Sequence, residues 1–312
     1  MKIHVIPICD VNERQRMRLK KLGDVKFFKK TISRDPDFLK KCIGADILMM
    51  TPRPPIDVVP YLKKCKFISV LATGFDGINI KLAKEKGILV GNVPAYATHS
   101  VVEHIFALIL GLSRNIKSSE KIVRNGKWNT ELMVVSMGLH GRTLGVFGFG
   151  KIGQMVADIA KTFGMRVIAY TKNVKNVASD IDFVSFDKFL ADSDVIVLAS
   201  PLNEETYHKF GEKEFAAMKK QPIFINTARG AIVDEKALIK ALKNKWIFGA
   251  GLDVFEKEPV ERSPFAKFDN VILSPHVAWG SDTAASNLVD VAIDNIEVFL
   301  NGTPKNIVNF GN

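Results

Sequence analysis

Three charged side chains in the second half of the chain have the types that acid–base chemistry on a carbonyl group requires. Arg229 lies in Asn-Thr-Ala-Arg-Gly, Glu258 precedes a proline, and His276 ends Ser-Pro-His. Each follows a short apolar run that resembles a buried strand. Residues that follow parallel strands gather at the carboxyl edge of a sheet. We therefore expect the three side chains to converge, although 29 and 18 residues separate them.

Together these residue types suit the transfer of a hydride to or from an anionic α-carbonyl compound. Arg229 would bind carboxylate and carbonyl oxygens, His276 would exchange the proton, and Glu258 would orient the imidazole and stabilise its charged form. Each residue also has a purely structural interpretation. An arginine often forms a surface ion pair, a glutamate can cap a loop, and a lone histidine is often structural.

A glycine-rich turn predicts a dinucleotide site. The segment Thr-Leu-Gly-Val-Phe-Gly-Phe-Gly-Lys-Ile-Gly begins at residue 143 and has the order strand, GxGxxG, helix. The first glycine permits a tight turn, the second lets the backbone approach a pyrophosphate, and the third allows close packing of helix on strand. The helix start directs free N–H groups at the phosphates. The residues predicted to bind the dinucleotide here are Gly148, Phe149, Gly150, Lys151, Ile152 and Gly153.

The next predicted strand, Arg166–Tyr170, bears on the choice between NAD and NADP. An NAD-specific site usually has a carboxylate after this strand to bind the ribose 2′-hydroxyl. Here Thr171 and Lys172 follow instead. The lysine would pair with a 2′-phosphate, which favours NADP. The alternative is that Lys172 faces solvent and the site also accepts NAD.

Short strand-like runs alternate with helical segments along the chain, which predicts an α/β protein with parallel sheets. The first series of strands is Lys2–Ile8, Val25–Phe28, Asp46–Met50, Phe67–Leu71 and Ile88–Val90, with helices at Asn12–Leu22, Asp37–Cys42, Ile56–Leu62 and Ile80–Lys86. The second series of strands is Thr143–Phe147, Arg166–Tyr170, Phe183–Phe186, Asp194–Ala199, Pro222–Asn226, Phe248–Asp253 and Asn270–Leu273.

Two longer helices frame the second series. Ala97–Arg114 has a long apolar helical pattern and is followed by a polar stretch to Gly141. Thr283–Leu300 is the last predicted helix, and a short tail at Asn306–Phe310 follows it. We therefore expect two α/β domains joined by long helices.

Composition excludes several classes of protein. The chain has 312 residues and a net charge of +11, of which residues 13–41 contribute +7 (eleven Lys or Arg against four Asp or Glu). No helix-turn-helix, RNA-recognition or zinc-finger pattern accompanies this charge, so we interpret it as a solvated lysine-rich face and expect no nucleic-acid partner.

The chain shows no sign of export or of a metal site. No run reaches the ~18 apolar residues of a membrane span, and the apolar run before Asp10 is too short for a signal peptide. Three cysteines at positions 9, 42 and 65 have neither CxxC spacing nor nearby histidine pairs. They indicate buried thiols in a reducing compartment rather than disulfides or zinc. We expect a cytoplasmic protein with no membrane partner and no bound metal.

The motifs resemble the D-isomer-specific 2-hydroxyacid dehydrogenases over essentially the full length of the chain. The resemblance is carried by Asn-Thr-Ala-Arg-Gly-Ala-Ile-Val-Asp-Glu from position 226, Ala-Gly-Leu-Asp-Val-Phe-Glu-Lys-Glu-Pro from 250, and Ser-Pro-His from 274. It places the family's catalytic residues on Arg229, Glu258 and His276. It also implies that Asp253 contacts the nicotinamide carboxamide.

Further site residues are implied by the same resemblance. The loop Ala72-Thr73-Gly74 corresponds to one that offers backbone N–H groups to the substrate carboxylate, although the family usually has glycine at position 72 and aspartate at position 79, where this chain has asparagine. Pro201 lies in the second cofactor-lining turn, and Thr227 and Ala228 precede the catalytic arginine at the cofactor.

The resemblance also implies a domain organisation. The cofactor domain, about residues 96–282, is inserted into a flavodoxin-like substrate domain made of residues 1–95 and 283–312, so that both domains are Rossmann-like or flavodoxin-like parallel sheets. Such enzymes are commonly homodimers through the inserted domain. The long helix that contains Ser100, Glu103 and His104 corresponds to an interdomain helix, and we interpret His104 as a packing residue rather than a catalyst.

The residues after His276 narrow the range of possible substrates. His-Val-Ala-Trp, with the indole of Trp279, resembles the glyoxylate and hydroxypyruvate reductase (glycerate dehydrogenase) branch, in which an indole lies beside the active site; a core tryptophan packed on Pro275 is the alternative. We therefore expect NADP, or NAD as second choice, and a small 2-oxo acid that is reduced to the D-2-hydroxy acid.

Two other functions stay open. A D-3-phosphoglycerate dehydrogenase-like enzyme would need a cation for the phosphate, for which Arg53 is a weak candidate. A corepressor-type protein of the same fold would sense the dinucleotide and bind peptides, but such proteins typically carry a much longer C-terminal tail than the residues that follow Thr283–Leu300.

Overall fold

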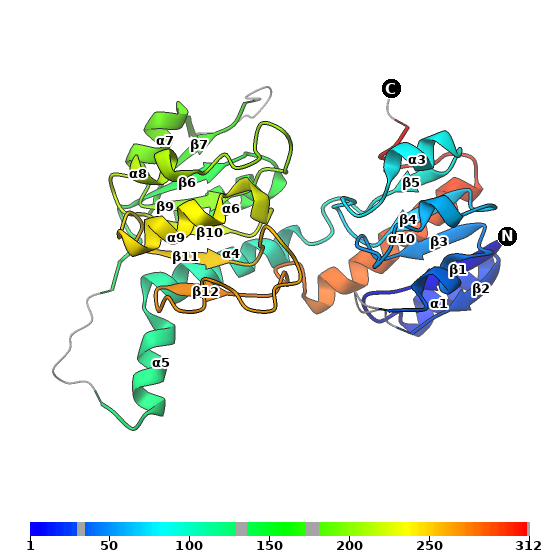
Figure 1. The fold of residues 1–312 in the computed structure, drawn as a ribbon, viewed down its shortest axis with the longest axis horizontal. Helices are drawn as coiled ribbons and strands as arrows, with labels where there is room; N and C mark the ends of the chain where they lie inside the picture. The colour runs from blue at the N-terminus through cyan, green and yellow to red at the C-terminus, as the bar shows by residue number, and fades with distance from the viewer. Residues whose placement is uncertain (30–34, 129–135, 173–180, 311–312) are drawn as a thin grey trace. The chain divides into compact units, whose positions relative to one another are not determined.

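The computed structural model describes residues 1–29, 35–128, 136–172 and 181–310. The chain divides into two compact units (Figure 1). Unit 1 consists of Met1–Ala97 and Gly280–Asn312, and unit 2 is the continuous segment Thr98–Trp279 between them. The boundaries predicted from the sequence, near residues 95 and 282, differ from these limits by two or three residues.

Unit 1 is built on a five-stranded sheet in the order β2-β1-β3-β4-β5, in which every pair of neighbours is parallel. The strands are β1 (Lys2–Ile6), β2 (Asp24–Phe27), β3 (Ile47–Met50), β4 (Phe67–Val70) and β5 (Leu89–Gly91). The central strands β3 and β4 are buried along their whole length, as expected for a parallel sheet with both faces covered.

Helices cover both faces of this sheet. They are α1 (Glu13–Leu22), α2 (Phe38–Cys42), η1 (Val59–Tyr61), α3 (Ile80–Glu85) and α10 (Asp282–Leu300). Arg14 and Arg18 of α1 form ion pairs with Asp290 of α10, so part of the basic N-terminal segment has acidic partners inside the unit. The tail after α10 returns to β5, where the Val308 N–H donates to the Val90 carbonyl.

Unit 2 contains a seven-stranded parallel sheet in the order β12-β11-β10-β9-β6-β7-β8. The strands are β6 (Thr143–Phe147), β7 (Arg166–Tyr170), β8 (Asp182–Phe183), β9 (Val195–Leu198), β10 (Ile223–Asn226), β11 (Gly249–Leu252) and β12 (Val271–Leu273). The order reverses at β6, which has β7 on one side and β9 on the other. This is the topological switch point at which doubly wound sheets bind dinucleotides.

The helices of unit 2 form two layers around two hydrophobic clusters. They are α4 (Thr98–Ser113), α5 (Ile116–Arg124), α6 (Lys151–Thr162), α7 (Phe186–Asp192), α8 (Glu212–Ala216), η2 (Gly230–Ile232) and α9 (Glu235–Lys243). Apolar residues of α4 and α6 pack on one face of the sheet, and those of α7, α8 and α9 pack on the other. Both units are parallel α/β structures, which confirms the predicted fold class.

The structure differs from the sequence analysis at one predicted helix and contains one helix that was not predicted. Ile56–Leu62 was predicted as a helix, but only Val59–Tyr61 is helical, as a single 3₁₀ turn. Pro60 within this segment has no N–H to donate, so an α-helix cannot pass through it. The stretch after Ala97–Arg114 was interpreted only as polar, and Ile116–Arg124 within it forms α5. No residue of α5 is buried.

The three cysteines are buried and form no disulfide, as the sequence predicted. Burial raises the pKa of Cys42 and of Cys65 to about 12, so both thiols stay protonated at neutral pH. Among the described residues, no helix is long and apolar enough to cross a membrane, and no group of three or more His, Cys, Asp or Glu side chains is arranged to hold a metal ion.

Candidate active site

The turn between β6 and α6 has the backbone that a bound pyrophosphate requires. Gly148 adopts φ +91°, and a Cβ at this position would lie 2.9 Å from the backbone of Ala199. A Cβ on Gly153 would lie 2.4 Å from the Gly148 carbonyl oxygen. Gly150 is different, because a Cβ there would meet nothing within 4 Å. Two of the glycines are therefore required by packing, and the third leaves open space.

That open space lies at the N-terminus of a twelve-residue helix. Gly150 is the N-cap of α6, and no side chain caps its first N–H groups. The first N–H groups of a helix lack intrahelical partners and carry the positive end of the helix dipole. The side chain of Phe149 packs edge-on against Phe183 with ring centroids 5.3 Å apart, which leaves only its backbone at the turn. Lys151 is exposed and Ile152 is half-buried. The turn thus fits the phosphates of a dinucleotide.

Thr171 and Lys172, the two residues predicted to meet the ribose, lie at the end of β7. Thr171 is half-buried and Lys172 is exposed. The Lys172 ammonium donates to the carboxylate of Glu205, and this hydrogen bond raises the pKa of Lys172. The lysine therefore already has an anionic partner, which a 2′-phosphate would have to share or displace. The residues 173–180 lie outside the described part of the chain.

Glu205 belongs to the turn that begins at Pro201 after β9. Pro201 is exposed, and its carbonyl accepts a hydrogen bond of 2.8 Å from the Thr206 hydroxyl. The Asn203 side chain accepts from the N–H groups of Glu205 and Thr206 at 3.0 Å each. These bonds hold the turn in a defined shape beside the carboxyl end of β9.

His276 and Glu258 form a hydrogen-bonded pair. The imidazole Nδ1 and the carboxylate Oε2 are 2.8 Å apart, and the other carboxylate oxygen accepts from the Phe255 N–H at 3.0 Å. Both side chains are mostly buried, with 27% of the imidazole and 16% of the glutamate side chain exposed. With Nδ1 donating to the carboxylate, Nε2 is the ring nitrogen left to exchange a proton with a substrate.

Arg229 lies on a segment that packs directly against the one carrying Glu258. A Cβ on Gly230 would lie 1.9 Å from the carbonyl carbon of Phe255, so the two backbones touch and only glycine fits. The buried side chain of Asn226 donates to the Arg229 carbonyl at 2.9 Å and accepts from the Ala228 N–H at 3.0 Å. Thr227, Ala228 and Arg229 are all half-buried at the carboxyl end of β10.

The backbone at His276 is left-handed, with φ +57°, which a side chain with a Cβ adopts only at a cost in energy. Asp253 holds it there. The Asp253 carbonyl accepts from the His276 N–H at 2.8 Å, and its carboxylate accepts from the N–H groups of Val277 and Ala278 at 2.9 Å each. The Trp279 indole N–H donates to the His276 carbonyl at 3.1 Å, so the indole is tied to the backbone of His276.

The predicted carboxylate-binding loop belongs to unit 1. The Thr73 hydroxyl donates to the Val93 carbonyl at 2.8 Å, and the Asn92 side chain donates to the Thr73 carbonyl at 2.7 Å. Within the described residues, the N–H groups of Thr73 and Gly74 have no hydrogen-bond acceptor. Ala72 is half-buried, and its own N–H donates to the Val70 carbonyl at 2.8 Å.

Sequence reasoning missed two side chains of this region. Ser274 donates to Asp253 at 2.6 Å, and His104 of α4 lies 2.8 Å from the Ser274 hydroxyl. His104 was predicted to be a packing residue. Its polar contact spans 170 residues of sequence, and neither the helical pattern around it nor the Ser-Pro-His motif indicates the pairing.

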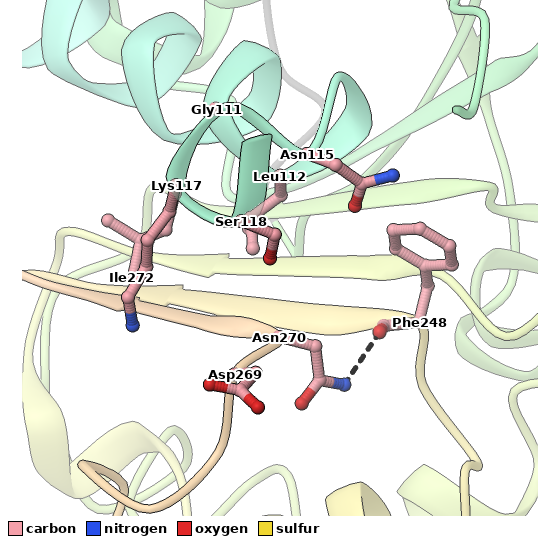
Figure 2. Close-up of a pocket in the computed structure, with 9 residues that line it drawn as sticks. All are labelled: Gly111, Leu112, Asn115, Lys117, Ser118, Phe248, Asp269, Asn270 and Ile272. Carbon is pink, nitrogen blue, oxygen red and sulfur yellow. Dashed lines mark hydrogen bonds between the residues drawn. The ribbon is translucent and has the colours of Figure 1, made fainter. Parts of the chain in front are cut away.

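One pocket of unit 2 lies away from these residues. Figure 2 shows the pocket, with the α4–α5 junction on one side and the starts of β11 and β12 on the other. Phe248 and Asn270 directly precede these strands, so the pocket is at the amino edge of the sheet. The predicted catalytic residues Arg229, Glu258 and His276 follow the carboxyl ends of strands, and none of the predicted site residues lines this pocket.

Comparison with known proteins agrees with this geometry. A family model described as D-isomer specific 2-hydroxyacid dehydrogenase, NAD binding domain, matches residues 106–278, which is more than half of the chain. The chain belongs to the D-isomer specific 2-hydroxyacid dehydrogenase family. It is therefore an oxidoreductase that uses a nicotinamide dinucleotide to reduce 2-oxo acids, and residues 106–278 are its dinucleotide-binding part.

Individual relatives refine this assignment. A glyoxylate reductase of Thermococcus litoralis is 40% identical over 277 residues, which cover 86% of this chain and 84% of that protein. The crystal structure of a glyoxylate reductase from Paecilomyes thermophila has a TM-score of 0.86 at 29% identity, covering 98% of each chain. An acyclic imino acid reductase (Bsp5) in complex with NADPH and D-Arg has a TM-score of 0.89 at 30% identity, covering 99% of this chain and 100% of that one.

Proposed function

We propose that this dehydrogenase reduces a small 2-oxo acid, glyoxylate or hydroxypyruvate, to the D-2-hydroxy acid with NADPH. The observation that carries the proposal is the His276–Glu258 pair, since a histidine held by a carboxylate through Nδ1 is a proton donor whose Nε2 faces away from its partner. Relatives named glyoxylate reductase, at 35–40% identity, support the choice of substrate.

Different residues of this chain bind the substrate, polarise its carbonyl group and donate the proton. Reduced nicotinamide, when bound, supplies the hydride. Arg229 binds the substrate carboxylate and polarises the carbonyl oxygen, on which negative charge develops. In unit 1, the N–H groups of Thr73 and Gly74 are available to bind a carboxylate. His276 protonates the developing alkoxide from Nε2 while Glu258 stabilises the imidazolium, so no free oxyanion accumulates.

The position of Trp279 favours a 2-oxo acid with a small side chain. Its indole is fixed by the hydrogen bond to the His276 carbonyl, so its ring has a defined place next to the catalytic imidazole. We propose that the indole limits the size of the group on the 2-oxo acid. A phosphorylated substrate would need a cation. Arg53, an exposed residue of unit 1, is the side chain to test for that role.

For the cofactor, we propose a preference for NADPH that is weaker than the sequence alone suggests. Thr171 offers no carboxylate to repel a 2′-phosphate, which favours NADPH, and a neighbour of the same fold is complexed with NADPH. The Glu205 carboxylate opposes this preference by competing for Lys172. Fluorescence titration of the purified enzyme with NADPH and NADH tests the proposal. Tighter binding of NADH would contradict it.

The substrate is tested by initial rates with glyoxylate, hydroxypyruvate, pyruvate and phosphohydroxypyruvate, each with NADPH and with NADH. We expect the highest kcat/KM for glyoxylate or hydroxypyruvate. His276→Asn is the control for the chemistry, because it keeps a polar side chain of similar size and removes the proton donor. A highest kcat/KM for phosphohydroxypyruvate would contradict the proposal, as would an unimpaired His276→Asn variant.

We also propose that the enzyme is a homodimer through unit 2. Helix α5 has no buried residue, and it presents the exposed side chains of Ile116 and Val123, with Trp128 81% exposed just beyond it. A helix with an exposed apolar face in a protein of this size is typical of a subunit interface. Light scattering should give twice the monomer mass of 34.6 kDa. A monomer at micromolar concentration would contradict the proposal.

Finally, we propose a cytoplasmic location. Its support is that all three cysteines are buried thiols outside any disulfide, as in proteins of reducing compartments. Cell fractionation followed by immunoblotting tests it, and recovery of the protein in an exported fraction would contradict it.

A further inference from the structure

A hydrogen-bonded chain connects helix α4 to the loop that carries the catalytic histidine. The Ser274 hydroxyl lies 2.6 Å from Asp253 Oδ1 and 2.8 Å from His104 Nε2. A hydroxyl has one proton, and the carboxylate can only accept, so Ser274 donates to Asp253. The hydroxyl must then accept from His104, whose Nε2 carries the hydrogen. The direction of the chain is therefore fixed from His104 through Ser274 to Asp253.

Asp253 carries a buried carboxylate that needs several hydrogen-bond donors. It is 0% exposed, and a buried carboxylate is stable only when donors satisfy it. Its donors are the Ser274 hydroxyl and the N–H groups of Val277 and Ala278. Of the residues that the structure describes, His104 is the only basic side chain within 4.0 Å of this carboxylate, at 3.7 Å.

The same carboxylate fixes the backbone on which His276 depends. His276 is in the left-handed region, with φ +57°. The next two N–H groups both donate to Asp253, so rotation or displacement of that carboxylate would release the strained segment. A shift of this backbone moves the imidazole away from the geometry that proton transfer requires.

We propose that His104 is a positioning residue for the catalytic histidine. Its Nε2–H holds the Ser274 hydroxyl in the orientation that donates to Asp253, and Asp253 in turn holds residues 276–278. His104 acts through two other side chains and does not touch the reacting atoms. The effect on turnover rests on the proposed function of His276, whereas the effect on the 276–278 backbone does not.

Two substitutions at position 104 separate the hydrogen bond from the bulk of the side chain. His104→Phe keeps a planar ring of similar size and removes the donor. His104→Gln places an amide N–H near the position of Nε2. We expect His104→Phe to lower kcat about tenfold, which corresponds to about 1.4 kcal/mol. His104→Gln should recover kcat to within about threefold of the wild type.

A second pair of variants tests whether the effect passes through Ser274. Ser274→Ala should lower kcat by a similar factor, and the double variant His104→Phe/Ser274→Ala should be no worse than either single variant. Residues that act in one chain give non-additive effects. His140→Phe, the same exchange at an exposed position of unit 2, is the matched control and should leave kcat unchanged.

Amide hydrogen exchange provides a readout that needs no substrate. In His104→Phe, the peptide that covers residues 274–280 should exchange about five- to tenfold faster, since local opening is governed by local free energy. A peptide from β6 should be unchanged, as should the 274–280 peptide of His104→Gln. If wild-type enzyme reduces none of the 2-oxo acids, the proposed function fails while this readout still tests the inference.

Three results would overturn the inference. They are unchanged exchange of the 274–280 peptide in His104→Phe, equal impairment of the Phe and Gln variants, and strictly additive effects of His104→Phe and Ser274→Ala. Global destabilisation by His104→Phe would accelerate exchange in β6 as well. In that case the kcat of Ser274→Ala tests the inference: a fall of about tenfold supports it, and an unchanged kcat overturns it.

Discussion

The phosphate turn and the His276 loop both follow strands of the same sheet, yet they are held in opposite ways. In the turn, Gly148 and Gly153 have no side chains because backbone atoms occupy the space, 2.9 Å and 2.4 Å from where a Cβ would lie. In the loop, a residue with a large side chain sits at φ +57° and is held by Asp253, which is 23 residues away. The turn is a local structure, and the loop is a tertiary one.

This difference teaches what each region contributes. A turn that depends on glycine can approach a ligand closely but offers only backbone N–H groups, which suits binding of phosphates. A loop held by a buried carboxylate can carry a strained imidazole, which suits chemistry. Binding of the dinucleotide and turnover should therefore be separable by mutation.

Of the variants considered, Arg229→Lys should show the largest loss of turnover without a loss of dinucleotide binding. A lysine keeps the charge but loses the planar fork that engages two oxygens together. We expect kcat to fall by ~10²–10³, the loss typical of one contact in a charge-stabilising site. The affinity for NADPH, measured by fluorescence titration, should stay within about twofold. A variant that keeps most of the wild-type kcat would show that Arg229 is not the substrate anchor.

In the glycine turn we expect the opposite effect, a loss of dinucleotide binding. Gly148→Ala introduces a Cβ against the Ala199 backbone at a φ of +91°, whereas Gly150→Ala introduces one into open space. We expect Gly148→Ala to weaken NADPH binding by about 10–100-fold, since strain of this kind costs on the order of 1–3 kcal/mol.

Gly150→Ala is the matched control for the turn. Its Cβ meets no protein atom, so its folded stability should be close to that of the wild type, measured by thermal unfolding without ligand. Any loss of dinucleotide affinity in Gly150→Ala then reports contact with the ligand itself. Equal loss of folded stability in Gly148→Ala and Gly150→Ala would contradict the claim that packing requires a glycine at position 148 but not at position 150.

A smaller effect is expected for Trp279→Phe. The phenyl ring keeps the apolar surface and loses the hydrogen bond to the His276 carbonyl. A net hydrogen bond contributes about 0.5–1.5 kcal/mol, so kcat should fall about two- to tenfold while NADPH affinity stays unchanged. Steady-state rates with glyoxylate and the bulkier 2-oxo acids measure this. Unchanged kcat and unchanged substrate preference would leave the indole with a packing role only.

The smallest effect is expected at the ribose end of the cofactor site. Lys172→Ala should weaken NADPH binding only about two- to fivefold, because an exposed pair contributes little. Glu205→Gln should strengthen it by a similar factor, since Lys172 is then released from its carboxylate partner. Thr171→Asp should shift the preference toward NADH by supplying a ribose acceptor that repels phosphate. Titrations in which Glu205→Gln weakens NADPH binding would contradict this arrangement.

The same contrast explains how much the sequence could predict. The GxGxxG turn, the alternation of strands and helices, and the gathering of residues 229, 258 and 276 at one sheet edge follow from local patterns and from topology, and all were predictable. The interactions that hold the loop were not. The contact of His104 with Ser274 and the pairing of Lys172 with Glu205 depend on side-chain orientation between distant segments, which no local periodicity encodes.

Helix α5 was not predicted, although its apolar residues are spaced as on one face of a helix. Ile116 and Val123 lie seven residues apart, and both are exposed. The polar residues between them led to the interpretation of the whole segment as a polar stretch.

The pH dependence of reduction in wild type and Glu258→Gln tests the central claim, that His276 donates the proton and Glu258 stabilises its charged form. Reduction requires the imidazolium, so the rate falls as pH rises and the ring loses its proton. Glutamine cannot supply the negative charge 2.8 Å from Nδ1, so the imidazolium is less stable in the variant. The fall in rate of glyoxylate reduction should therefore begin at lower pH in Glu258→Gln than in the wild type, whereas superimposable profiles would contradict the account.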